Sequence, residues 1–97
     1  MVMTQQYLAG ELSVLLAQLH EVATCPQHAH EVDRLRQQAE TVPVRALGWV
    51  TTCALHVAEA LCWDSLVRGD VAGFDRQAEV SAQLHDFGVC AALLPEK

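Results

Sequence analysis

The sequence predicts an all-α protein, a compact antiparallel four-helix bundle in up-down-up-down order. Apolar residues recur along the chain at spacings of three and four, which places them on one face of a helix. Three prolines, at positions 26, 43 and 95, and the turn signal Gly69-Asp70 divide the chain into four segments. No stretch alternates β-branched with polar residues as a half-buried strand would. The short loops between the segments favour antiparallel neighbours.

The chain length predicts a single helical domain, 1–97, because single domains usually contain roughly 100–200 residues. Hydrophobic residues make up 52% of the composition, which is too high for a disordered chain. Only two Trp, one Tyr and two Phe are present, so the core must be mainly aliphatic. A domain of this size buries somewhat over ~60% of its extended-chain surface. Association with a partner would therefore add useful burial.

The first helix is expected over about residues 4–24, with Thr4 as its N-cap. Its apolar face consists of Leu8, Leu12, Leu15, Leu19 and Val22. The second helix, about 26–41, should begin at Pro26, because the missing N–H costs nothing in a first turn, and Thr24 or Cys25 would cap it. Its narrow apolar face consists of His28, Val32, Leu35, Ala39 and Val42. We expect this polar helix to be the most exposed of the four.

The third helix, about 44–68, is predicted to be the longest and central one, and it is apolar on two faces. One face consists of Leu47, Val50, Ala54, Val57 and Leu61; the other consists of Trp49, Cys53, His56, Ala60 and Trp63. A helix of this kind lies in the middle of a core, or packs on its own domain with one face and on a partner with the other. The second face is therefore a predicted partner interface.

The fourth helix is expected over about residues 71–94. Gly69 supplies the left-handed residue that ends the third helix, and Asp70 caps the next one. Its apolar face consists of Val80, Leu84, Phe87, Ala91 and Leu94. Pro95 would end the helix, since a proline cannot continue it.

The charge balance excludes several partners. Twelve acidic residues against six basic ones give an acidic chain with a net charge of −6, and the five arginines are scattered. Binding to nucleic acid or to an anionic membrane needs clustered Lys and Arg, so neither is expected. The N-terminus lacks the positive region of a signal peptide. The longest nearly apolar stretch, 46–58, is shorter than the ~20 residues of a membrane span. We expect a cytoplasmic protein with reduced cysteines.

Four possible metal ligands fall within eleven positions: His20, Cys25, His28 and His30. Imidazole and thiolate are ligands that zinc and copper prefer, and a turn between two helices could gather them. Their spacing does not match the paired units of zinc ribbons, and His28 and His30 would point about 200° apart on a helix. The alternative interpretation is a polar helix end at which His28 extends from the apolar face toward solvent.

The leading functional prediction is a small protein–protein interaction or regulatory module, acting as a homodimer or on another protein. The alternative is a helical bundle that binds a metal or a small ligand through His and Cys. An enzyme is the least supported class, because no P-loop, dinucleotide-binding or nucleophile-elbow motif occurs in the sequence. His56 with Glu59 is a single reversed copy of a di-iron E-x-x-H pair, so we expect His56 to be a core or interface histidine.

Overall fold

The computed structural model describes residues 5–93, and it confirms the predicted all-α, four-helix fold. The helices are α1 (Gln5–Glu21), α2 (Pro26–Thr41), α3 (Val44–Arg68) and α4 (Val71–Cys90). Residues 5–93 contain no strand. The bounds of α2 and α3 agree with the expected ones, whereas α1 and α4 each end a few residues early. The expected cap Thr4 and the residues Leu94 and Pro95 lie outside the described part.

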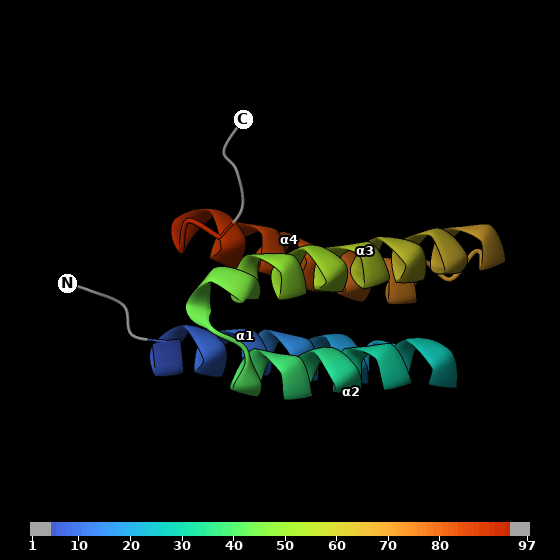
Figure 1. Cartoon of the computed structure of the whole chain (residues 1–97). Helices are drawn as coiled ribbons and strands as arrows, with labels where there is room; N and C mark the ends of the chain where they lie inside the picture. Colours follow the sequence, from blue (N-terminus) through green and yellow to red (C-terminus); the bar gives the residue numbers. More distant parts are fainter. Residues whose placement is uncertain (1–4, 94–97) are drawn as a thin grey trace.

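The molecule consists of two antiparallel hairpins stacked on one another (Figure 1). Helices α1 and α2 form one layer, α3 and α4 form the other, and the connection between α2 and α3 passes from layer to layer. Helix α3 packs most extensively on α4 and also contacts α2 and α1, whereas the backbones of α2 and α4 do not approach closely. The prediction that the longest helix is also the central one is therefore confirmed.

The core lies between the two layers and is almost entirely aliphatic. Its buried side chains are Leu8, Leu12, Leu16, Leu19, Val32, Leu35, Ala39, Leu47, Val50, Ala54, Val57, Ala58, Leu61, Val80 and Leu84. Leu16 is fully buried, while Leu15, which the spacing placed on the core face, packs only at its edge. Helix α1 contacts all three other helices, and its buried face is rotated by a fraction of a turn relative to the face that the spacing predicted.

Three predicted helix ends are confirmed. Cys25 is the N-cap of α2, and its sulfur accepts a hydrogen bond from the backbone N–H of His28 at 3.4 Å. Gly69 adopts a φ of 74° after α3, and the Asp70 N–H donates to the carbonyl of Ser65 at 2.8 Å. The Asp70 carboxylate then accepts from the Gly73 N–H at 3.0 Å. Each residue supplies what the end of a helix lacks, an acceptor for free N–H groups or a left-handed turn.

Helix α4 ends in the same kind of turn without a glycine. Ala92 has a φ of 58°, and the Leu93 N–H donates to the Gly88 carbonyl at 2.7 Å. An alanine in the left-handed conformation is strained by about 1–2 kcal/mol. A glycine would relieve this strain, but part of the gain in stability is lost because glycine makes the unfolded chain more flexible. We expect Ala92→Gly to raise the free energy of unfolding by about 0.5–1 kcal/mol in urea titrations. Ala91→Gly is the matched control; at a φ of −86° it should lower that free energy.

Helix α3 is the one helix in the described part that is long and apolar enough to cross a membrane by length and composition. In this fold, 39% of its apolar window is buried inside the protein. Core helices of soluble proteins meet the same criterion, so the finding is weak evidence for a membrane span.

Candidate functional site

The second apolar face of α3 lies on the surface of the molecule. Trp49 is 61% exposed and Trp63 is 67% exposed, although both are large apolar side chains. His56 is also exposed, and Cys53 and Ala60 are half-buried. The other apolar face of the same helix is buried in the core, as the spacing predicted. Of the two positions expected for His56, core or interface, the core position is wrong. That this face is a partner interface stays a prediction.

Val67 extends this surface by one further step. It lies four residues after Trp63, continues the alternating spacing and is 79% exposed. We define the outer α3 face as Trp49, Cys53, His56, Ala60, Trp63 and Val67. The sequence analysis missed Val67, although its place in the spacing was visible. Exposed Leu66 and Val71 add apolar surface beside it, where α3 turns into α4.

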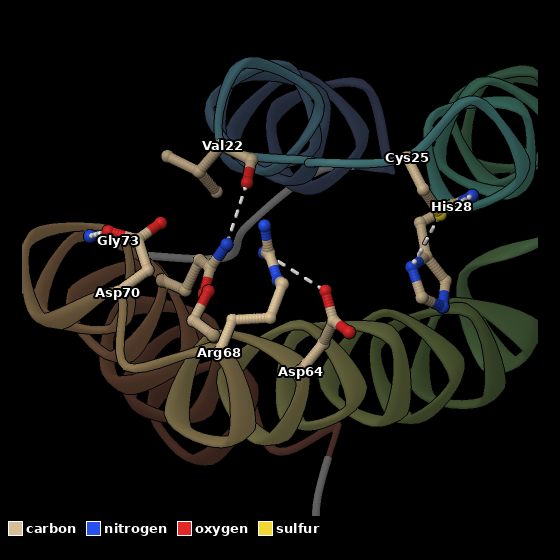
Figure 2. Close-up of polar contacts among 9 residues, drawn as sticks. Val22, Cys25, His28, Asp64, Arg68, Asp70 and Gly73 are labelled. Atoms are coloured by element: carbon tan, nitrogen blue, oxygen red, sulfur yellow. Dashed lines mark hydrogen bonds and ion pairs between the residues drawn. The ribbon is translucent and has the colours of Figure 1, made fainter.

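The outer α3 face carries no acidic or basic side chain apart from His56, in a chain whose net charge is −6. Four charged residues border it: Arg45, Glu59, Asp64 and Arg68. Their formal charges cancel, and Arg68 Nη2 lies 3.0 Å from Asp64 Oδ2 (Figure 2). The surface is therefore an electrically neutral stripe on an acidic molecule, which favours contact with another apolar surface.

Shallow hollows flank the outer α3 face. One of about 230 Å³ lies between α2 and α3, beside Trp49 and Cys53, with Glu31 and Arg34 on its α2 side. Another of about 270 Å³ lies at the turn between α3 and α4 and includes Leu66, Val71 and Phe74. Neither hollow holds an activated nucleophile, because burial raises the pKa of Cys53 in the first and the buried Ser65 hydroxyl in the second donates to Gln77 Oε1. They therefore fit the side chains of a partner better than a reaction.

The cysteines are all free thiols. Burial raises the pKa of the Cys53 thiol. Burial, and to a smaller extent the nearby Glu59 carboxylate, raises the pKa of the Cys62 thiol. Both thiols are therefore protonated at neutral pH, and a protonated thiol is a poor nucleophile and a poor metal ligand. These two residues fit the role of small apolar side chains.

The four predicted metal ligands are only partly brought together. Cys25 Sγ lies 3.1 Å from His28 Nδ1, and Figure 2 shows this pair at the start of α2. His20 pairs with a different residue, since its Nε2 lies 3.6 Å from Asp33 Oδ2. His30 is exposed. No group of three or more His, Cys, Asp or Glu within residues 5–93 is placed to hold a metal ion.

This donor set leads to an expectation for metal removal. A zinc ion takes four ligands, and Cys25 with His28 would supply two of them. We expect the thermal midpoint of protein prepared without a histidine tag to change by less than about 2 °C when a chelator is added. A larger fall, together with zinc or copper in elemental analysis, would instead support the metal-binding alternative.

No family model, curated protein or solved structure matches this chain.

A buried polar bridge is the main feature that the sequence analysis missed. The Gln77 side chain is fully buried, and its Nε2 donates to the Val22 carbonyl at 2.9 Å. The Ser65 hydroxyl, also fully buried, donates to Gln77 Oε1 at 2.7 Å. The bridge joins α3 and α4 to the end of α1, where Figure 2 labels Val22. Gln77 occupies a core position of α4, and only that placement in the helical spacing could have signalled it.

Proposed function

We propose that the chain is a helical protein–protein interaction module and that the outer α3 face is its binding surface. The observation that carries the proposal is the exposure of Trp49 and Trp63, both more than half exposed on one side of the longest helix. Tryptophan is enriched among the residues that dominate binding energy at protein interfaces. A continuous apolar stripe with polar borders is typical of a surface that another protein covers.

The proposed binding mode is the packing of a partner helix along α3. Each indole would bury apolar surface, and the small side chains of Cys53 and Ala60 would let the partner backbone approach closely between them. The neutral stripe avoids the repulsion that the rest of this acidic surface would cause. Because α3 is held by three neighbouring helices, the surface is formed before binding and loses little entropy when it is occupied.

A partner protein is better supported than a membrane surface. Helices that lie in a membrane interface usually carry Lys and Arg along the polar face, and the chain has one Lys and five Arg against twelve acids. Four free cysteines agree with action in a reducing compartment, which we propose to be the cytoplasm.

Trp49→Glu and Trp63→Glu test the proposal. Each change places a charge in the centre of the contact, so we expect binding of a partner, whether another protein or a second copy, to weaken at least about 30-fold. The measurement is affinity capture with the tagged chain, followed by titration of the captured partner in light scattering or calorimetry. The fold should survive, because both positions are largely exposed.

Val14→Glu is the matched control for this test. Val14 is 57% exposed on α1 and is not part of the outer α3 face, so its replacement should leave binding intact. The proposal is wrong if the tryptophan variants bind as well as the parent chain, or if Val14→Glu weakens binding as much as they do.

A further inference from the structure

We propose that the partner on the outer α3 face is a second copy of this chain, paired antiparallel about a two-fold axis that crosses α3 at the level of residue 58. The inference rests on the proposed function and adds the identity of the partner and the register of the contact. It depends on the order of large and small side chains along the face, together with their exposure and the charges at the two ends.

The spacing along the outer α3 face reads the same in both directions. Successive residues are four, three, four, three and four positions apart, so the pattern is symmetric about residue 58. Two antiparallel copies related by a two-fold axis therefore bring each member of the face to the level of another member. The three resulting pairs are Trp49 with Val67, Cys53 with Trp63, and His56 with Ala60.

Each of these pairs sets a larger side chain against a smaller one. Trp49 meets Val67 at both ends, Trp63 meets Cys53 further in, and the imidazole of His56 meets the methyl group of Ala60 near the axis. Large side chains opposite small ones let two helices approach and interdigitate, with axes about 8–10 Å apart. The α3–α4 hollow of about 270 Å³ adds room beside Val67, because Leu66 and Val71 line it.

A parallel pairing would place identical residues opposite one another. Two Trp49 indoles would then meet at one end and two Trp63 indoles near the other, while two Ala60 side chains would leave a gap between them. The order of side chains on this face therefore favours the antiparallel arrangement.

The available area reaches what a specific dimer needs. From Trp49 to Val67 the face is about 27 Å long at 1.5 Å per residue. Trp49 and Trp63 are 61% and 67% exposed, and a tryptophan contributes up to about 250 Å². Two copies of this pair thus supply roughly 600 Å², more than half of the ~1,000 Å² that is the minimum for a specific interface. The four smaller members of the face and Leu66 extend the contact.

The charges at the ends of the face also agree with antiparallel pairing. Arg45 lies one turn before Trp49, so the two-fold axis brings it level with residue 71 of the second copy. Asp70, which begins α4, is the adjacent residue there. Arg68 lies at the same end, but its charge is offset by Asp64 at 3.0 Å. The α3 helix dipoles also run in opposite directions.

An exchange of Trp49 and Val67 tests the register directly. Both side chains are more than half exposed, so Trp49→Val and Val67→Trp should each leave the folded monomer intact. In the antiparallel register, the first change opens a gap at both ends and the second crowds both ends. We expect the dissociation constant from sedimentation equilibrium to rise about 30-fold for Trp49→Val and about 10-fold for Val67→Trp. The double variant again places a tryptophan opposite a valine at both ends, so its dissociation constant should lie within about 3-fold of that of the parent chain.

Several results would overturn the inference. If the parent chain dimerises but the double variant does not recover, the register is wrong while the proposed interaction surface stands. A parent chain that is monomeric up to millimolar concentration excludes the second copy as partner. Affinity capture with the Trp49→Glu and Trp63→Glu variants then tests the proposed function separately. Flotation of such a monomer with neutral lipid vesicles would identify a membrane as the partner and overturn both.

Oxidation independently tests whether the two α3 helices of the dimer are antiparallel or parallel. Antiparallel pairing holds the two Cys53 residues about 15 Å apart along the helix, which is too far for a disulfide. Parallel pairing would place them opposite one another. We expect mild oxidation of the dimer to give no Cys53–Cys53 linked peptide in mass spectrometry, and its rapid formation would exclude the antiparallel register.

Discussion

Replacing Gln77 with Ala is expected to lower the free energy of unfolding by about 3 kcal/mol, or the thermal midpoint by roughly 12–24 °C. The Gln77 side chain is fully buried and bridges Ser65 to the Val22 carbonyl. Its removal leaves a cavity and deprives a buried hydroxyl and the carbonyl of their partner. Urea titration monitored by circular dichroism measures the change.

Gln83→Ala is the matched control, because Gln83 lies on the same helix and is exposed. Its effect should stay within about 0.5 kcal/mol. Gln77→Leu separates the two causes, since leucine fills most of the cavity but makes no hydrogen bond. Adding Ser65→Ala to Gln77→Leu removes one unpaired group and should recover part of the loss. Equal effects for Gln77→Ala and Gln83→Ala would show that the bridge does not form.

The helix boundaries were predictable because local chemistry sets them. Pro26 restricts its own backbone to a first turn, Gly69 tolerates a φ of 74°, and Asp70 offers a carboxylate to the N–H of Gly73. Each effect acts within four residues, so the sequence alone carries it. The end of α4 was misplaced for the same reason, because Ala92 takes the left-handed turn that a glycine usually provides.

Features that depend on packing between distant segments could not be predicted. Gln77 and Val22 lie 55 residues apart, and no local pattern records their hydrogen bond. The rotation of α1 that buries Leu16 in place of Leu15 depends on its contacts with three helices. Spacing defines the apolar side of a helix, whereas the neighbours determine which residues of that side are fully buried.

The two candidate sites differ in how much the sequence could establish. The outer α3 face was visible as a second apolar spacing, and one helix is enough to define it. A metal centre instead needs several side chains from different segments to converge within a few ångströms. The structure brings Cys25 and His28 together, while His20 lies against Asp33. Closeness in sequence across a helix boundary was therefore a weak guide to closeness in space.

Gly48→Ala is expected to destabilise the fold by about 1–2 kcal/mol, although alanine is the better helix former by about 1 kcal/mol. A Cβ atom built on Gly48 would lie 2.7 Å from the carbonyl oxygen of Leu93, which follows α4. That oxygen belongs to the backbone, and the Leu93 N–H is held by the Gly88 carbonyl at 2.7 Å. The added methyl group must therefore displace the end of α4 from α3.

Gly10→Ala is the matched control for Gly48→Ala. Gly10 lies in α1 with nothing within 4 Å of a built Cβ, so there the helix propensity acts alone and stability should rise by about 1 kcal/mol. The same substitution thus has opposite effects at two helical glycines, and denaturant titration of both variants measures the difference. If Gly48→Ala also stabilised the protein, the close approach of α3 to the turn after α4 would be excluded. Because Gly48 is the residue before Trp49, loss of that contact would also loosen the first turn of the proposed binding surface.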